Sequence, residues 1–135
     1  EIVIQQDEHM DEVNLPNEVV QAVQAFIQPL KASQSEGQSP GSVEVMRSKV
    51  RAHAFTTLGK LCLRNKPLTR KMVPVFIKEL RSGTSAIVRN NVLVILCDMC
   101  RTFTDTVDGQ VDAITSCLRD ENEIVRRHSL MILIQ

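Results

Sequence analysis

The feature that most constrains the fold is a segment that occurs three times in the second half of the sequence. Each copy begins with Val-Arg and continues into an apolar-rich run, at Val50, Val88 and Val125, so the copies lie 38 and 37 residues apart. A period close to 40 residues with two helices per unit is typical of HEAT and armadillo repeats. The sequence therefore predicts an all-α protein, an α-solenoid of HEAT/armadillo-type helical repeats that is a fragment of a longer array.

Apolar residues recur with helical spacing across the repeated region, residues 43–135, which we expect to hold about two and a half HEAT repeats. The expected helices cover residues 44–64, 67–81, 84–103, 107–119 and 121–135. Pro74 lies inside the second of them and predicts a kink or a late helix start. Asp120 with Glu123 resembles a capping box at the start of the last one.

The first third of the chain has a different composition. Residues 1–32 are expected to form an acidic N-terminal segment with one amphipathic helix, and residues 33–42 a flexible Ser/Gly/Pro linker. The formal net charge of zero divides into −6 for residues 1–42 and +6 for residues 43–135. This asymmetry indicates either a polyanionic partner or an acidic arm that masks the basic part. Ser39, which precedes a proline in the linker, is a candidate phosphorylation site.

Basic residues are concentrated between Arg47 and Lys78, where nine bases occur without a single acid. Several of them crowd the turn between the first two expected helices, and two lie near the first turn of a helix, where the macrodipole disfavours cations. Binding of phosphate would account for this arrangement, and a solvated basic edge is the alternative. The candidate phosphate- or DNA-binding residues are Lys49, Lys60, Arg64, Lys66, Arg70 and Lys71.

Three arginines recur with the period and are interpreted as structural repeat positions: Arg51, Arg89 and Arg126. We expect such an arginine to bond to an aspartate or to helix-end carbonyls of the neighbouring repeat. Asp120, six residues before Arg126, is the expected aspartate. A glycine and a valine occupy that place before the other two arginines, which predicts an incomplete ladder.

Other reactive side chains also follow the repeat. Cys97 and Cys100 form a CxxC motif, but it falls inside an expected helix, and Cys62 occupies the same repeat position as Cys100, which favours core thiols over a metal or redox site. His53 and His128 likewise share one repeat position. We predict no catalytic residue, no metal and no cofactor, and hence neither an enzyme nor a small-molecule substrate. No apolar run approaches the roughly 20 residues that span a bilayer, so no membrane partner is expected.

Residues 50–63, 86–100 and 117–120 resemble the HEAT-repeat D-type subunits of the condensin II complex. The resemblance covers roughly residues 50–135, and the run Arg-Asn-Asn, an apolar stretch and Cys-Asp-x-Cys carries its specificity. It implies a non-enzymatic regulatory subunit that acts in mitotic chromosome condensation, in the nucleus and on the chromosome. The implied partners are the kleisin subunit, the SMC ATPase pair and DNA or chromatin. The alternative is a protein-interaction HEAT scaffold without direct nucleic-acid contact.

Overall fold

A computed structural model describes residues 14–28, 40–83 and 85–134 of the chain. Within these residues every regular element is helical, which confirms the all-α prediction. The elements are α1 (Asn17–Ile27), α2 (Pro40–Cys62), α3 (Lys66–Ser82), α4 (Ala86–Thr102), α5 (Thr104–Val107), η1 (Asp108–Gln110), α6 (Val111–Ser116), η2 (Cys117–Arg119) and α7 (Glu123–Leu133).

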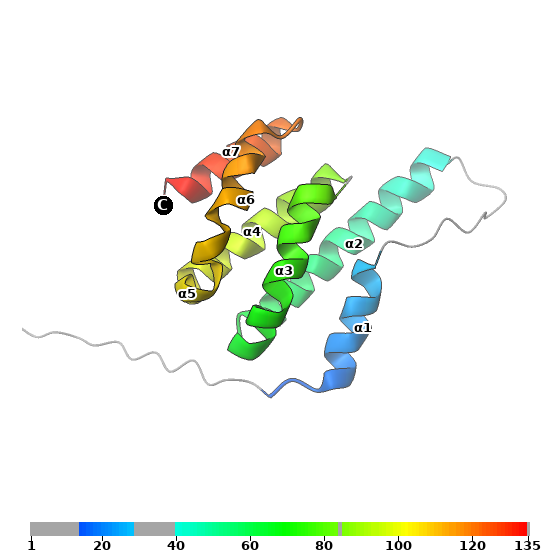
Figure 1. The fold of residues 1–135 in the computed structure, drawn as a ribbon. Coiled ribbons are helices and arrows are strands. Elements are labelled where there is room, and N and C mark those ends of the chain that lie inside the picture. The colour runs from blue at the N-terminus through cyan, green and yellow to red at the C-terminus, as the bar shows by residue number, and fades with distance from the viewer. Residues whose placement is uncertain (1–13, 29–39, 84, 135) are drawn as a thin grey trace, which may run out of the picture.

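The helices lie in two layers, as expected of an α-solenoid (Figure 1). One layer holds α2, α4 and α7, the helices that carry the three Val-Arg segments, and each packs against the next. The other layer holds α1, α3 and the α5–α6 segment. The helix pairs α2–α3 and α4 to α6 are therefore two successive repeats, and α7 opens a third.

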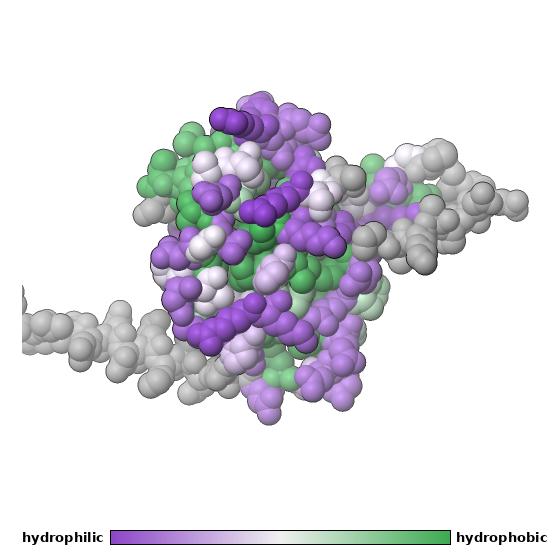
Figure 2. Space-filling view, in the orientation of Figure 1, coloured by the Kyte–Doolittle hydropathy of each residue, from purple (hydrophilic) through white to green (hydrophobic). Residues whose placement is uncertain are grey.

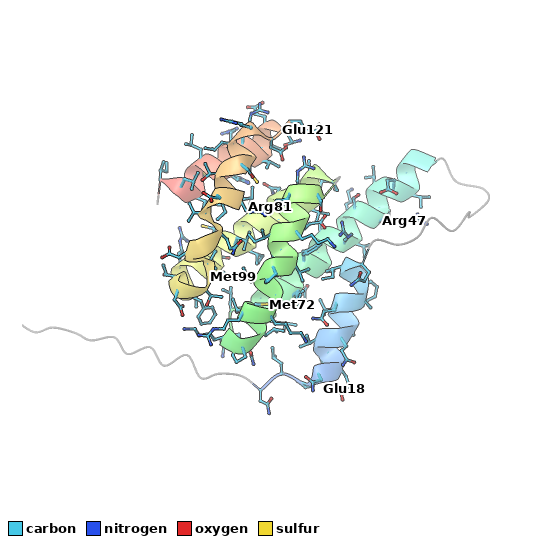
Figure 3. All side chains as sticks on the ribbon, viewed as in Figure 1. Glu18, Arg47, Met72, Arg81, Met99 and Glu121 are labelled. Carbon is cyan, nitrogen blue, oxygen red and sulfur yellow. The ribbon has the colours of Figure 1, made fainter. Side chains whose placement is uncertain are left out.

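The core runs between the two layers and is built mainly from aliphatic side chains. Phe55 of α2 and Phe76 of α3 meet there with ring centroids 5.9 Å apart, and both are buried. Met72 and Met99 add buried sulfur-containing side chains from α3 and α4 (Figure 3). Helices α2, α3 and α4 contribute most of the buried apolar side chains, and this burial is the main source of helix stability in a protein of this kind.

Gly59 allows α2 and α4 to approach each other closely. A Cβ atom built on this glycine would lie 2.3 Å from Cγ2 of Ile95, far inside van der Waals contact. The absence of a side chain at Gly59 therefore makes room for Ile95. Glycine lowers the helix propensity of α2 at this position, but it allows neighbouring repeats to pack closely.

The helix α2 begins at Pro40, four residues earlier than the periodicity predicts. Residues 40–42 were assigned to the linker and are instead helical, so the predicted linker boundary is wrong at this end. The fixed φ angle of proline suits the first turn of a helix, where its missing N–H donor is not needed. Residues 33–39, the rest of the predicted linker, lie outside the described residues.

The helix α3 runs from Lys66 through Pro74 without interruption, so the predicted late start is wrong. Pro74 cannot donate the usual backbone hydrogen bond, which leaves the carbonyl of Arg70 without its helical partner. Both residues are exposed to solvent. Water can therefore satisfy that carbonyl, and the apolar face of the helix remains on the core.

The expected helix at 107–119 is divided into the short segments α5, η1, α6 and η2. The sequence Asp108-Gly109 lies at the break, and both residues have low helix propensity. The apolar stripe expected here was Val107, Val111, Ile114 and Leu118. Val107 and Ile114 are buried, but Val111 is 45% exposed, so the broken helix confirms only part of the stripe. The buried residues of this segment therefore come from several short helices rather than from one continuous helix.

The start of α7 differs in its capping residue. Asn122 is the N-cap, and its side-chain oxygen accepts hydrogen bonds from the backbone N–H groups of Ile124 and Val125 at 3.0 and 3.4 Å. The capping box expected from Asp120 is therefore wrong. The Asp120 carboxylate accepts from the N–H of Asn122 at 2.8 Å and otherwise bonds to Arg89 of α4, in the same repeat.

The surface reflects the same layering (Figure 2). On the face shown, hydrophilic residues cover the helices, while hydrophobic residues lie between them and over α7.

The burial of the repeat valines depends on whether another helix precedes theirs in the layer. Val88 and Val125 are fully buried against the preceding helix of their layer, whereas Val50, at the same repeat position in α2, is 45% exposed. Within the described residues no helix precedes α2 in that layer.

Candidate phosphate-binding site and the repeat arginines

Arg89 of α4 is the most enclosed of the three repeat arginines, with a side chain only 7% exposed. Its Nε and one terminal nitrogen donate to the two carboxylate oxygens of Asp120 at 2.8 and 2.9 Å. The other terminal nitrogen donates to the carbonyl of Gly83 at 2.8 Å. A forked ion pair of this kind, fully hydrogen-bonded, is the geometry in which a buried arginine is stable.

The pairing shifts the pKa of both groups. Burial by itself raises the pKa of the Asp120 carboxyl, but hydrogen bonds from Arg89 and from the Asn122 N–H, together with the nearby positive charges, lower it further than burial raises it. The pKa of Arg89 is raised, with the hydrogen bond to Asp120 as the largest cause. Asp120 is therefore ionised throughout the neutral range, and the pair links α4 to the end of its own repeat.

Arg51 makes the equivalent arrangement one repeat earlier. Its Nε donates to the carbonyl of Ile27, the last residue of α1, at 2.7 Å. Its two terminal nitrogens each donate to one oxygen of Glu79 in α3, both at 2.7 Å. The guanidinium carbon also lies 5.3 Å from the centroid of the Phe55 ring. Glu79 was not among the predicted residues, because its separation of 28 residues from Arg51 matches no repeat interval.

Arg126 makes only the backbone half of this arrangement within the described residues. One terminal nitrogen donates to the carbonyls of Asp120 and Glu121 at 2.7 and 3.0 Å. The structure thus gives the Asp120 carboxylate to Arg89 and the Asp120 carbonyl to Arg126. The expected pairing of the Asp120 carboxylate with Arg126 is therefore wrong. All three arginines bond to a carbonyl at the end of the preceding helix, but only Arg51 and Arg89 also pair with a carboxylate within the described residues.

The shared histidine position forms a second contact between repeats. Asn91, which occupies it in α4, donates to the carbonyl of Ala52 at 3.3 Å and to the hydroxyl of Thr56 at 3.1 Å. His128 of α7 bonds through Nδ1 to the side-chain oxygen of Asn90. His53, the first member of the set, is exposed. The position therefore joins neighbouring helices of one layer.

The six candidate phosphate-binding residues separate into a cluster and an outlier. Arg64, Lys66, Arg70 and Lys71 lie together around the turn from α2 to α3, and Lys60 lies about one helical turn away on α2. We call these five residues the turn cluster. Lys49 lies about 16 Å from Lys60 along the α2 axis, given a rise of 1.5 Å per residue, so the structure does not bring it to the cluster.

The start of α3, beside which the turn cluster lies, is capped by a side chain. The side-chain oxygen of Asn65 accepts from the N–H of Leu68 at 2.8 Å, and the Thr69 hydroxyl donates to the carbonyl of Cys62 at 2.7 Å. These bonds fix the turn that carries the cations. Arg64, Arg70, Lys71 and Lys60 are exposed, and Lys66 is half-buried.

One acid from the following repeat reaches the turn cluster. Asp105 of α5 lies 3.0 Å from Nζ of Lys66 and 3.8 Å from a terminal nitrogen of Arg70. Nζ of Lys66 also lies 5.9 Å from the centroid of the Phe103 ring. Hydrogen bonding to Lys66 is the largest cause of a lowered pKa for Asp105. Arg64, Lys71 and Lys60 make no ion pair within the described part of the chain.

Asp105 and Phe103 were missed by sequence analysis, although a signal for them exists. Lys66 begins α3, and Thr104, 38 residues later, begins α5, so the starts of these two elements are equivalent by the repeat period. Equivalent ends of successive repeats lie side by side in a solenoid. An acid at one start and bases at the other can therefore be paired from the sequence alone.

The cysteines have the environment of packed thiols. Cys62 is completely buried, and burial raises its pKa to about 12. Burial also raises the pKa of Cys97, Cys100 and Cys117. A raised pKa keeps the sulfur protonated at neutral pH and therefore weakly nucleophilic. Among the described residues no group of three or more potential ligands is placed to hold a metal ion.

Two further expectations from the sequence concern the membrane and Ser39. In the described part of the chain no helix combines the length and the apolarity needed to cross a bilayer. Ser39, the candidate phosphorylation site, lies outside the described residues.

The two-layered stack, the recurrent arginines and the close contact between α2 and α4 define an α-solenoid of the HEAT class. The family model described as "Condensin-2 complex subunit D3-like. HEAT repeats" matches residues 6–80, more than half of the chain. The chain therefore belongs to this family. The match includes α1, which lies upstream of the residues that carry the resemblance in the sequence.

Relatives occur in animals and plants. The chain is 41% identical over 88 residues to condensin-2 complex subunit D3 of Mus musculus and, over the same length, to subunit D3-L of Xenopus laevis. It is 33% identical over 82 residues to subunit CAP-D3 of Arabidopsis thaliana. These matches cover 65%, 65% and 61% of the chain, respectively, but only 6% of each relative.

Proposed function

We propose that this chain is a non-enzymatic HEAT-repeat scaffold of condensin II that acts in mitotic chromosome condensation. Family membership supports this role, and so do the names of the relatives, each of which is a condensin-2 complex subunit. The proposed partners are the kleisin subunit and the SMC ATPase pair, and the proposed location is the nucleus, on the chromosome. In this role the chain positions other subunits and DNA, while a separate ATPase performs the chemistry.

We further propose that the turn cluster contacts the phosphates of DNA or chromatin. The observation that carries this proposal is the presence of exposed cations at one end of one repeat, of which Arg64, Lys71 and Lys60 have no acidic partner within the described residues. Lysine and arginine side chains that contact phosphate release counterions and so provide affinity independent of sequence. The turn is fixed by its own hydrogen bonds, so the cations are positioned before any phosphate binds.

Salt dependence of duplex binding tests the DNA contact. Fluorescence anisotropy with a labelled 30-base-pair duplex between 50 and 200 mM salt should give a log–log slope near −0.9 for each phosphate contact, hence about −3 if Arg64, Lys71 and Lys60 make contact and up to about −5 if Lys66 and Arg70 also do. The variant Arg64→Glu, Arg70→Glu, Lys71→Glu should lose most of this affinity. The matched control is Arg81→Glu, Arg119→Glu, Arg127→Glu, which changes the charge equally at exposed sites outside the cluster. Equal losses from both variants would contradict a localised contact.

A second candidate function is protein interaction without DNA, and one observation favours it. Phe26 of α1 and Met46 and Val50 of α2 are 61%, 63% and 45% exposed and line a cavity of about 380 Å³. Arg47 lies on the same part of α2, near the end of α1 (Figure 3). Exposed apolar side chains around a cavity mark interaction sites more often than bare surface does. Loss of kleisin binding in Met46→Glu with unchanged DNA affinity would assign this groove to the protein partner.

A further inference from the structure

The acid Asp105 occupies an unusual place beside the turn cluster. It belongs to the repeat after the one that carries the cluster, and a single carboxylate oxygen faces both Lys66, at 3.0 Å, and Arg70, at 3.8 Å. The hydroxyl of Thr106 donates to its other oxygen at 3.5 Å. One anionic group therefore sits between two cations, as a phosphate oxygen bound at this place would.

The contact is arranged so that it can be exchanged. The side chains of Lys66, Arg70 and Asp105 are 39%, 63% and 58% exposed, so water reaches all three. Exposed ion pairs contribute little to stability because solvent screens them and ordering two flexible side chains costs entropy. Nζ of Lys66 also lies 5.9 Å from the centroid of the Phe103 ring, a distance at which the ring attracts a cation. The ammonium group would therefore remain at the cluster after the carboxylate had moved away.

We propose that Asp105 is an intrinsic competitor for phosphate at the turn cluster, which holds Lys66 and Arg70 until the backbone of a duplex displaces it. This inference rests on the proposed contact between the cluster and DNA. A phosphate that approaches Lys66 either displaces the carboxylate or binds beside it and is repelled by its charge. In both cases Asp105 lowers the affinity of the turn cluster for DNA.

The competition also connects DNA binding to the junction between repeats. Lys66 and Arg70 begin the second helix of one repeat, and Asp105 begins the second segment of the next. Displacement of Asp105 breaks these two ion pairs between the repeats. A bound duplex therefore removes a contact that restrains α5 against α3, whereas Arg89 and Asp120, buried in the second repeat, are left intact.

The test compares Asp105→Asn with Asp112→Asn in the full chain. Asp112 of α6 is also exposed, and it makes no ion pair with a described residue. Both changes raise the net charge by one unit, so long-range attraction of DNA increases equally. Only Asp105→Asn should release Lys66 and Arg70. We expect it to tighten binding of a 30-base-pair duplex at 100 mM salt by about two- to five-fold and to steepen the salt slope by up to about 2.

The outcomes distinguish failure of the competition from failure of the DNA contact. Tighter binding and a steeper slope for Asp105→Asn, with a much smaller change for Asp112→Asn, support competition. Equal changes in the two variants, or no change in Asp105→Asn while the wild-type chain binds the duplex, overturn competition and leave the DNA contact in place. Binding by Asp105→Asn alone supports competition and shows that the acid blocks the wild-type cluster. Absence of binding by all three proteins overturns both proposals.

Discussion

The repeat arginines and the turn cluster contain the same type of side chain in two opposite situations. Arg89 is enclosed, and all three of its nitrogens donate hydrogen bonds to groups of the same chain. Arg64 and Arg70 are exposed; Arg64 makes no ion pair within the described residues, and Arg70 lies 3.8 Å from Asp105, which it shares with Lys66. The difference shows that periodic recurrence marks arginines that hold repeats together. The arginines outside the period, Arg64 and Arg70, lie at a turn and remain exposed.

The largest effect is expected from Arg89→Ala. Removal of the guanidinium leaves the Asp120 carboxylate nearly buried without its partner, and breaking a buried ion pair in this way costs about 3 kcal/mol or more. Urea denaturation followed by circular dichroism measures this loss. Arg70→Ala, which removes an exposed arginine, should change the free energy of unfolding by less than about 0.5 kcal/mol. A cost below 1 kcal/mol for Arg89→Ala would remove the distinction between the two groups.

A smaller loss is expected from Gly59→Ala, which tests packing between repeats without changing charge. The new methyl group would collide with Ile95 and force α2 and α4 apart, at a cost of about 1–3 kcal/mol. Gly41→Ala is the matched control, because a Cβ there meets nothing within 4 Å. That change should be neutral or slightly stabilising, since alanine favours a helix. Equal stability of the two variants would show that α2 and α4 are less closely packed than described.

Acidification should distinguish the two aspartates that pair with bases. The pKa of Asp120 is lowered in the folded chain, so its pair stabilises the fold above the unfolded pKa of about 4 and loses this contribution as the pH falls through the folded value. Asp120→Asn should therefore flatten the decrease in unfolding free energy between pH 5 and pH 2. Asp105→Asn should alter that decrease much less, because its pair is exposed. A similar flattening by both substitutions would contradict the contrast.

A small effect on stability, about 1.5 kcal/mol or less in total, is expected from the triple variant Arg64→Glu, Arg70→Glu, Lys71→Glu. These side chains are exposed, and substitutions at such positions change unfolding free energies by about 0.5 kcal/mol or less each. Thermal melts monitored by circular dichroism should therefore resemble those of the wild-type chain. A melting temperature lowered as far as that of Arg89→Ala would show that the cluster is part of the folding framework.

Much of this fold could be predicted because it is periodic. The Val-Arg spacing indicated the class of the protein, and the apolar pattern located helices such as α3 and α4 to within a few residues. The segment from 107 to 119 shows the limit of that reasoning, because burial of Val107 and Ile114 survives while Asp108-Gly109 breaks the helix. Apolar spacing assumes one continuous helix, so where the helix breaks it predicts some core residues correctly, such as Ile114, and others wrongly, such as the exposed Val111.

The partners of the charged residues were harder to predict than the residues themselves. The repeat identified Arg89 as structural, but pairing with Asp120 crosses 31 residues of sequence and depends on how the second repeat closes. The contact between Arg89 and the backbone carbonyl at position 83 cannot be predicted from the residue type, because every residue has such a carbonyl. Asp105 was missed for a related reason: its partners lie one repeat away, where only the stacking of equivalent ends brings them together.

The most direct test of the central claim replaces arginine by lysine, one position at a time, at Arg51, Arg89, Arg64 and Arg70. Lysine keeps the positive charge but loses the planar fork that satisfies a carboxylate and a carbonyl together. We expect the free energy of unfolding to fall by about 1 kcal/mol or more for the first two variants and to stay within about 0.5 kcal/mol of the wild-type value for the last two. Equal losses at all four positions, or none at any, would contradict the claim that the repeat arginines, unlike those at the turn, hold the solenoid together.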